Sequence, residues 1–466
     1  MTLDLVLKNA QLALPGGGLT PGSVGVKDGR IAVIAEKGEE LTGRETVDCG
    51  GLWLMPGVVD PHVHFDFGNP ETDFETESRA AALGGTTSIL SFHRSKELRD
   101  SFPIVKERAE RQSCIDFGLH FGLTSQLHVD TLDEVARRFG VTSFKLYLMY
   151  KGAAGAAKGF TEIDDALLYT ALKATAAIPG AVMGVHCENV EVIPALRPAL
   201  KAAGRNDLAA WNEQSPGFLE AENVFRVCYF AEQTGTPVNI VHMSSGESLE
   251  IVRYLRSKPS RRDGPPIYVE TCPHYLVVDD QWPAGILAKV NPPVRGKADI
   301  EALWEGVFDG SITTIGSDHV ARKRETKDKD IWGASAGFPG SGLLLPLLLD
   351  QGYHRRGLAV DRIVELTSAN AAKIYNMPTK GGIAVGKDAD LLVVDPDLER
   401  TVDHAVSESF SDYSPYQGMV LKGWPVRTLV RGRTVMLDGK ITDEARAAPW
   451  GRYLDRASLD YHDYHA

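Results

Sequence analysis

The sequence predicts an α/β fold, a (β/α)8 TIM-like barrel joined to a smaller β-sandwich domain that both termini form. Strand-like apolar runs alternate with helical patterns through the middle of the chain, which is typical of parallel β/α units. Eight such runs can be counted, and eight parallel strands are the number that closes a barrel. They cover residues 54–64, 86–93, 116–123, 142–148, 181–187, 237–243, 266–272 and 313–319.

The two ends of the chain differ from the middle. Residues 1–53 and 382–440 hold short strand-like runs separated by Gly, Asp and Pro. This shared character predicts one sandwich domain made jointly by both ends, with residues 54–381 inserted between them as the barrel. The last stretch, 441–466, is polar and aromatic, and we expect it to form a tail or arm.

The composition indicates a globular protein of the cytoplasm. The 466 residues carry a formal net charge of −12. This charge argues against nucleic acids and anionic membranes as partners, because both select a basic face. The apolar runs are too short to cross a bilayer, and the N-terminus lacks the basic start of a signal peptide. Five cysteines without a CxxC pair indicate reduced thiols.

Side chains that bind metals or protons stand where the predicted strands end. In a (β/α)8 barrel the carboxyl ends of all strands meet at one face, where active sites lie. Residues far apart in the sequence would therefore converge on one site. The candidate metal ligands are His62, His64, Lys145, His186, His242 and Asp318.

His62 and His64 form an HxH pair at the end of the first predicted strand. Side chains two residues apart on a strand point to the same side, so both imidazoles face one point. Neutral imidazoles suit a borderline cation such as zinc. A single buried histidine is more often a packing residue, but matching partners at other strand ends favour a metal. His186 and His242 are interpreted as the imidazoles of a second metal.

Lys145 lies near the end of a buried strand. Burial of an ammonium group is costly and depresses its pKa. The neutral amine can then add CO2 and become a carbamate, a carboxylate able to bridge two metals. The alternative is a lysine that extends to the surface, and the other ligands favour the carbamate.

Asp318 is expected both to bind metal and to accept the proton of an attacking water. Other chemistry-bearing residues stand at or near strand ends as well. We expect His93, His120 and His319 to pack or to orient ligands, and Cys187 and Cys272 to be core thiols.

These residues, in this order, resemble the amidohydrolase superfamily and its cyclic amidase branch of dihydropyrimidinases (hydantoinases), allantoinases and dihydroorotases. The motifs PGVVDPHVHF, SFKLYLMYKG, HCEN, VHMSS, NPPVR and GSDH carry the resemblance, which covers nearly the whole chain. It implies two divalent metal ions per subunit, usually zinc with manganese or cobalt as alternatives. It also implies that the six ligands above bind them, with Lys145 carboxylated at N6, and that the chain forms a homotetramer.

Within the branch, Tyr150, five residues after Lys145, resembles the hydantoinase pattern, in which the hydroxyl binds the substrate carbonyl and the developing oxyanion. Asp66 stands where dihydroorotases usually carry an arginine for the substrate carboxylate. We expect Asp66 to repel such a carboxylate and so to favour a neutral ring. Asn291, in a motif similar to that of dihydroorotases, and the backbone at Ala336 are expected to hold the imide edge.

The resemblance therefore implies hydrolytic ring opening of 5-substituted hydantoins and dihydropyrimidines to N-carbamoyl amino acids. Two metals activate water as hydroxide, Asp318 moves the proton and Tyr150 stabilises the oxyanion. The alternatives are an allantoinase, which the segments ETCPHYL and WGASAG favour, and a dihydroorotase. A non-catalytic interaction protein of the same fold is a further alternative, but such relatives typically lose ligands, and here all six are present.

Overall fold

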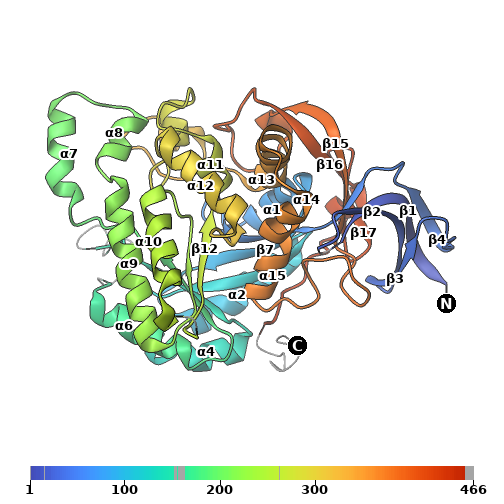
Figure 1. The fold of residues 1–466 in the computed structure, drawn as a ribbon, viewed down its shortest axis with the longest axis horizontal. Helices are drawn as coiled ribbons and strands as arrows, with labels where there is room; N and C mark the ends of the chain where they lie inside the picture. The colour runs from blue at the N-terminus through green and yellow to red at the C-terminus, as the bar shows by residue number, and fades with distance from the viewer. Residues whose placement is uncertain (1, 15, 152–154, 156–162, 262, 457–466) are drawn as a thin grey trace.

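The computed structural model describes residues 2–14, 16–151, 155, 163–261 and 263–456. Two hydrogen-bonded sheets organise this part of the chain (Figure 1). One consists of parallel strands from the middle of the sequence, and the other is built from both ends. The predicted α/β class, a barrel with a smaller β domain from both termini, is thereby confirmed.

The parallel sheet closes on itself. One edge strand, β13, pairs with β12, while the short strand β14 that follows it pairs with β6 at the other edge. Residues 314–320 thus join the two edges and complete the barrel. The barrel strands are β6 (Val58–His64), β7 (Thr86–His93), β8 (Asp116–Gly122), β9 (Ser143–Tyr147), β10 (Val182–His186), β11 (Val238–Ile240), β12 (Ile267–Thr271), β13 (Thr314–Ile315) and β14 (His319–Val320).

Several strands are shorter or more divided than the sequence predicts. The run 54–64 is two strands, because β5 (Trp53–Pro56) joins the terminal sheet and only β6 enters the barrel. The last barrel strand is interrupted between β13 and β14. A Cβ atom at Gly316 in this interruption would lie 2.6 Å from the Cβ atom of His62, so only glycine permits this approach.

Helices follow most barrel strands and lie outside the sheet (Figure 1). Local sequence signals set their ends. Asp164 caps α6 by accepting a hydrogen bond from Leu167 N–H, and Ser245 caps α10 in the same way. The longer helices are α1 (Asp73–Leu83), α2 (Leu98–Gln112), α4 (Leu132–Phe139), α6 (Asp165–Ala176), α7 (Ile193–Ala202), α9 (Gly217–Thr234), α10 (Gly246–Ser257) and α12 (Lys297–Asp309). Shorter ones are α3 (Gln126–Asp130), α8 (Leu208–Glu213), α11 (Pro273–Val277), α13 (Leu344–Leu348), α14 (Val360–Val364), α15 (Asn370–Ile374) and α16 (Asp443–Ala447).

The terminal sheet joins the two ends of the chain where β15 pairs antiparallel with β5. Its strand order is β18-β17-β16-β15-β5-β1-β2-β3, with β4 on β1. Apolar side chains from both ends, such as Leu7, Leu12, Leu391 and Leu429, form one buried cluster in it. Besides β5, its strands are β1 (Leu3–Ala13), β2 (Leu19–Lys27), β3 (Arg30–Glu36), β4 (Gly43–Asp48), β15 (Leu391–Thr401), β16 (Val420–Val430), β17 (Arg433–Leu437) and β18 (Lys440–Ile441).

A buried ion cluster links the terminal sheet to the barrel. Lys380 Nζ lies 2.5 Å from Asp116 Oδ2 on β8 and 2.6 Å from Asp390 Oδ2, just before β15. Arg431, in the turn between β16 and β17, also donates to Asp116. Burial acts to raise the pKa of Asp116, but the two cations outweigh it and hold that pKa below its usual value. Because Lys380 and Arg431 already pair with these carboxylates, the cluster serves as a structural junction between the terminal sheet and the barrel.

The C-terminal segment lies against the barrel. After α16, Leu454 N–H donates to the carbonyl oxygen of Phe117 on β8, and the side chain of Arg456 donates to Ser143 Oγ at 2.6 Å. Residues 457–466 lie outside the described part of the chain, so the predicted tail is described only in its first part. Among the described helices, none is both long and apolar enough to cross a membrane.

Candidate metal centre and active site

One cavity at the carboxyl ends of the barrel strands brings the sequence-predicted residues together. His62 is fully buried just behind its wall and contacts the lining side chains Lys145 and Asp318. The other predicted residues all line the cavity: His64, Lys145, Tyr150, His186, His242, Asn291, Asp318 and Ala336.

His62, His64 and Asp318 form a compact group. The Nε2 atoms of both histidines lie 3.2 Å from Oδ1 of Asp318. The three atoms that could bind a metal ion, one from each residue, lie within 4.8 Å of one another. Burial acts to raise the pKa of Asp318, but the adjacent imidazoles outweigh it and keep that pKa well below its usual value, so the group is a carboxylate.

Lys145 reaches the same group from β9. Its Nζ atom lies 3.1 Å from His62 Nε2, and its side chain is buried. Burial lowers its pKa to about 8, so the neutral amine is accessible near neutral pH. A bare ammonium would face an imidazole nitrogen here, whereas a carbamate would extend oxygen atoms toward the ligands.

His186 and His242 face each other beside this group, with the ring centroid of His242 5.3 Å from that of His62. His186 Nδ1 lies 2.8 Å from His242 Nε2. The other nitrogen of His186, Nε2, lies 3.2 Å from the carboxylate of Glu188, which also accepts a hydrogen bond from Ser215 Oγ at 2.7 Å. A carboxylate that accepts a hydrogen bond from one ring nitrogen fixes the tautomer in which the other nitrogen offers its lone pair. Metal-binding histidines show this pattern.

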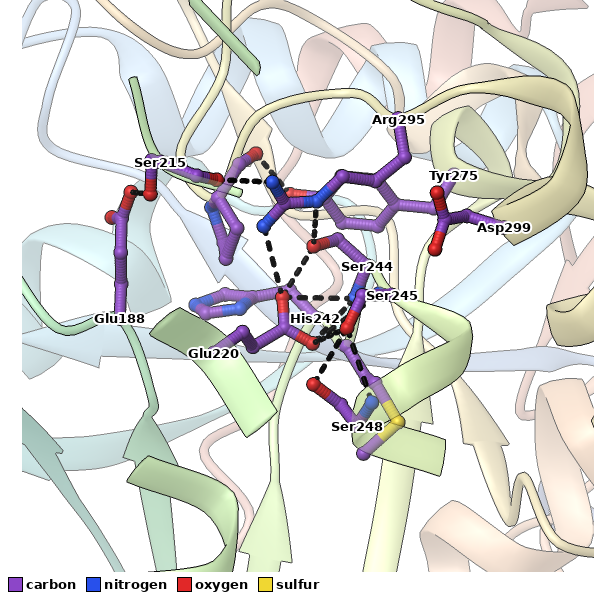
Figure 2. Close-up of polar contacts among 12 residues, drawn as sticks. Glu188, Ser215, Glu220, His242, Ser244, Ser245, Ser248, Tyr275, Arg295 and Asp299 are labelled. Carbon is purple, nitrogen blue, oxygen red and sulfur yellow. Dashed lines mark hydrogen bonds and ion pairs between the residues drawn. The ribbon is translucent and has the colours of Figure 1, made fainter. Parts of the chain in front are cut away.

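A buried polar network holds the loop that carries His242 (Figure 2). His242 has a φ of 41°, an uncommon backbone conformation for a histidine. Just after it, the backbone N–H of Ser244 donates to Glu220 Oε1 at 3.1 Å, and the Ser244 hydroxyl also donates to Glu220. Arg295 donates to Ser244 Oγ at 3.0 Å. These bonds over-determine the loop and so stabilise the strained position of the imidazole.

The donor set fits divalent metal ions. Two imidazole nitrogens, His64 Nδ1 and His242 Nδ1, are buried without a hydrogen-bond partner among the described residues. Imidazoles, a carboxylate and a lysine poised for carboxylation combine the ligand types that zinc and similar cations prefer.

The residues expected to bind substrate line the cavity beside these ligands. Asn291 Oδ1 accepts a hydrogen bond from Trp211 Nε1 at 3.1 Å, which fixes the orientation of its side chain. Next to Ala336, Gly337 N–H donates to the carbonyl oxygen of Lys289 at 3.0 Å, which fixes the backbone there. Tyr150 follows β9 and lies 5.8 Å, between ring centroids, from Tyr147.

Comparison with known proteins decides the family. The amidohydrolase family model matches residues 53–435. The chain belongs to the amidohydrolase family. It is similar to the L-hydantoinase of Paenarthrobacter aurescens, at 34% identity covering 98% of this chain and 99% of that one. It is also 34% identical to an allantoinase of Rubrobacter xylanophilus, covering 97% of both chains. Among solved structures, the L-hydantoinase (dihydropyrimidinase) from Arthrobacter aurescens matches with a TM-score of 0.88 at 31% identity, covering 97% of this chain and 99% of that chain.

In this amidohydrolase the other histidines at strand ends lie outside the group of candidate metal ligands. His319 Nε2 lies 2.9 Å from Glu77 on α1, while its Nδ1 accepts from Gly340 N–H at 3.1 Å, so it fastens a loop to the barrel. His120 stacks on a neighbouring ring, and His93 lies 2.8 Å from a serine hydroxyl. Cys187 and Cys272 are buried free thiols, and burial raises the pKa of both.

The structure overturns the expectation about Asp66. Its backbone has a φ of 77°, an uncommon conformation for an aspartate, two residues after the HxH pair. Asp66 Oδ2 lies 2.8 Å from a guanidinium nitrogen of Arg108, and the residue lines an adjoining cavity, which shares Phe67 and Arg94 with the cavity of the candidate ligands. Because Arg108 neutralises it, Asp66 presents no repulsive charge to a substrate carboxylate.

Sequence reasoning missed two kinds of residue at this site. Glu270 contacts His62. The sequence signal for this residue was a carboxylate within the apolar run IYVETC, where burial of a charge is costly unless the charge pairs with another group. Arg94 and Arg322 line the cavity. Each follows a predicted strand end by one to three residues, which was the available signal.

Proposed function

We propose that this amidohydrolase opens the ring of cyclic amides, namely 5-substituted hydantoins and dihydropyrimidines, to give N-carbamoyl amino acids. The observation that carries the proposal is one cavity lined by candidate ligands from several strands together with Tyr150 and Asn291. The similarity to proteins named hydantoinase and dihydropyrimidinase over nearly the whole chain supports it.

We further propose the cofactor. Two divalent metal ions, zinc foremost with manganese or cobalt as alternatives, would supply Lewis acidity and lower the pKa of water when bound. The ligands would be the four imidazoles of His62, His64, His186 and His242, the carboxylate of Asp318 and Lys145 carboxylated at N6. The carbamate is favoured by burial of Lys145, since burial holds its pKa at about 8.

The residues of the chain then act on water and ring. Asp318, a carboxylate at neutral pH, accepts a proton from the attacking water. The water oxygen bonds to the ring carbonyl carbon, the carbon–nitrogen bond breaks, and Asp318 returns the proton to the leaving nitrogen. Tyr150 donates a hydrogen bond to the carbonyl oxygen as charge develops there. Asn291 and the backbone at Ala336 hold the imide edge.

A second candidate substrate is allantoin. The chain is similar over nearly its full length to a protein named allantoinase. This similarity favours allantoin as a substrate as specifically as the similarity to hydantoinases favours hydantoin. Allantoin is itself a hydantoin with a ureido substituent, so the same chemistry would open it.

The experiment is a side-by-side panel of hydantoin, dihydrouracil, allantoin and dihydroorotate with metal-loaded enzyme. Loss of ring absorbance and release of the N-carbamoyl product are followed together. We expect hydantoin or dihydrouracil to be opened well. Allantoin as the best substrate would select the second candidate, and dihydroorotate as the best would overturn the hydantoin assignment.

We also propose a homotetramer. Large aromatic side chains on the outer face of two neighbouring helices, Phe218, Phe225 and Tyr229 on α9 and Tyr254 on α10, are exposed, and such a surface suits contact with another subunit. Light scattering on the purified protein measures the mass of the assembly, and a monomeric mass would contradict the proposal.

A further inference from the structure

The end of the described chain runs beside a barrel strand and places an arginine against it. We call residues 450–456 the C-terminal arm. Phe117 N–H on β8 donates to the carbonyl oxygen of Arg452 at 3.0 Å, and Leu454 N–H donates to that of Phe117 at 2.8 Å. Two residues further along, the side chain of Arg456 is fully buried. The arm thus brings one cation into the interior of the protein.

Arg456 donates hydrogen bonds to two neighbouring barrel strands. One guanidinium nitrogen lies 2.6 Å from Ser143 Oγ on β9, and another donates to the carbonyl oxygen of Leu119 on β8. Burial of a cation is costly unless hydrogen bonds compensate for the lost water. Arg456 therefore depends on these acceptors, and in return it fixes where the Ser143 hydroxyl lies.

Ser143 connects Arg456 to His120 on β8. Ser143 Oγ lies 2.6 Å from His120 Nδ1, and His120 Nε2 lies 2.9 Å from the carbonyl oxygen of Pro61. A carbonyl oxygen only accepts, so Nε2 carries a proton. Burial lowers the pKa of His120 well below its usual value, and the charge of Arg456 adds to this effect, so the ring is neutral and Nδ1 has a lone pair. The Ser143 hydroxyl therefore donates to Nδ1 while its oxygen accepts from Arg456.

This series of hydrogen bonds, which we call the relay, ends beside two candidate metal ligands. Pro61 directly precedes His62 on β6. Ser143 precedes Lys145 by two residues on β9, and side chains at this spacing point to the same side of a strand. The relay thus fixes the backbone before one ligand and the side chain next to another.

The ring of Phe92 lies between the relay and the same ligands. It stacks on His120 with the ring centroids 4.4 Å apart, and its centroid lies 4.5 Å from that of His62. Lys145 Nζ lies 4.2 Å from the Phe92 centroid. A displacement of His120 would therefore reach the ligands through packing as well as through the backbone.

We propose that Arg456 is a positioning residue of the metal centre. Through Ser143 it fixes the tautomer and the place of His120, and His120 in turn supports the segments that carry His62 and Lys145. The C-terminal arm would then be part of the active site's framework, although it lines no part of the cavity among its described residues. This inference rests on the proposed function, because it concerns the proposed metal ions.

The first test is Arg456→Met, which keeps a long side chain and removes the cation. We expect zinc affinity, measured by competition with a chelator, to fall by about tenfold, the lower end of what the loss of a group that orients a metal ligand costs. The visible absorption of cobalt-loaded protein should also change, because it reports the geometry of the ligands. Arg456→Lys keeps the charge without the planar fork, so its zinc affinity should be intermediate.

The matched control is Tyr453→Phe, which removes another anchor of the arm. The Tyr453 hydroxyl donates to the carbonyl oxygen of Phe139 at 2.6 Å, so its loss weakens the arm and leaves the relay intact. We expect lower stability to denaturant, with wild-type zinc affinity and cobalt spectrum. A loss of zinc affinity as large as that of Arg456→Met would overturn the inference, because docking of the arm alone would then explain both.

Ser143→Ala breaks the relay in its middle and leaves the arm unchanged. It should lose zinc affinity as Arg456→Met does, and the double variant should lose little more than either, since both cut one series of bonds. Additive losses would overturn the inference. Wild-type zinc affinity in Ser143→Ala would also overturn it, even if Arg456→Met does not fold, and would leave the proposed function standing. Wild-type protein that binds neither zinc nor cobalt would refute the proposed cofactor and this inference together.

Discussion

The Nδ1 atom of His62 lies 2.5 Å from Oε1 of Glu270, and both side chains are fully buried. The second oxygen of Glu270 accepts a hydrogen bond from Asn239 at 3.2 Å, and Asn239 contacts the Tyr375 hydroxyl at 2.7 Å. Burial and the Lys145 charge act to lower the pKa of His62, but the carboxylates of Glu270 and Asp318 outweigh them and raise it. Glu270 thus orients the His62 ring so that its Nε2 faces the site.

Glu270→Gln should weaken metal binding. The variant keeps the shape of the side chain but loses the charge that fixes the tautomer of His62, and loss of such a partner typically costs about 10- to 100-fold in affinity or activity. Metal retained against a chelator is the measurement. Glu107→Gln, on the exposed face of α2, is the control. Wild-type retention in Glu270→Gln would show that the contact does not support the metal.

Lys145→Ala should lose both metals and activity, because it removes the proposed carbamate. A small carboxylic acid such as acetate or propionate should restore part of the activity by supplying the missing oxygens. Metal content and turnover are measured with and without the acid. A variant that keeps both metals and normal turnover would show that Lys145 carries no carbamate function.

Asp318→Asn should bind substrate and turn it over at least about 100-fold more slowly, the usual scale for a lost general base. Substrate binding, turnover and metal content are measured on the same preparation. Since Asp318 is also a proposed ligand, the comparison uses only protein that retains its metals. Turnover close to wild type in that protein would assign the proton transfer to another group.

Lys380→Met should destabilise the junction between the barrel and the terminal sheet. It leaves Asp116 and Asp390 buried without this ammonium, and breaking a buried pair in this way costs about 3–5 kcal/mol. Denaturant unfolding measures the loss. Lys106→Met, in an exposed pair with Glu110, is the control and should change stability by about 1 kcal/mol or less. Equal effects of the two variants would mean that the cluster does not stabilise the junction.

The barrel could be predicted because its strands and its ligands follow simple periodic rules. The HxH pair marks the end of one strand, and histidines or a lysine mark the ends of others. What could not be predicted was where each strand stops. His242 and Asp318 lie just beyond strand ends, with φ angles of 41° and 50°. The nearby backbone N–H groups of Ser244 and Ser317 donate to the distant carboxylates of Glu220 and Asp60, and these bonds hold the backbone.

The charge of the cavity could not be predicted from the positions of single residues. Asp66 follows the HxH pair closely in sequence, yet its side chain pairs with Arg108 outside the cavity that the ligands line. Arg94 and Arg322 lie 228 residues apart and meet only because the barrel closes. Pairing and convergence of this kind depend on tertiary structure, which no local pattern encodes.

The most direct test of the account is a metal titration of the chelated protein during opening of the hydantoin ring. The account predicts that the chelated protein is inactive and that added zinc or manganese restores ring opening, with saturation near two ions per chain. The N-carbamoyl amino acid should appear in step with loss of the ring. Full ring opening by the metal-free protein, or none at any metal concentration, would contradict the account.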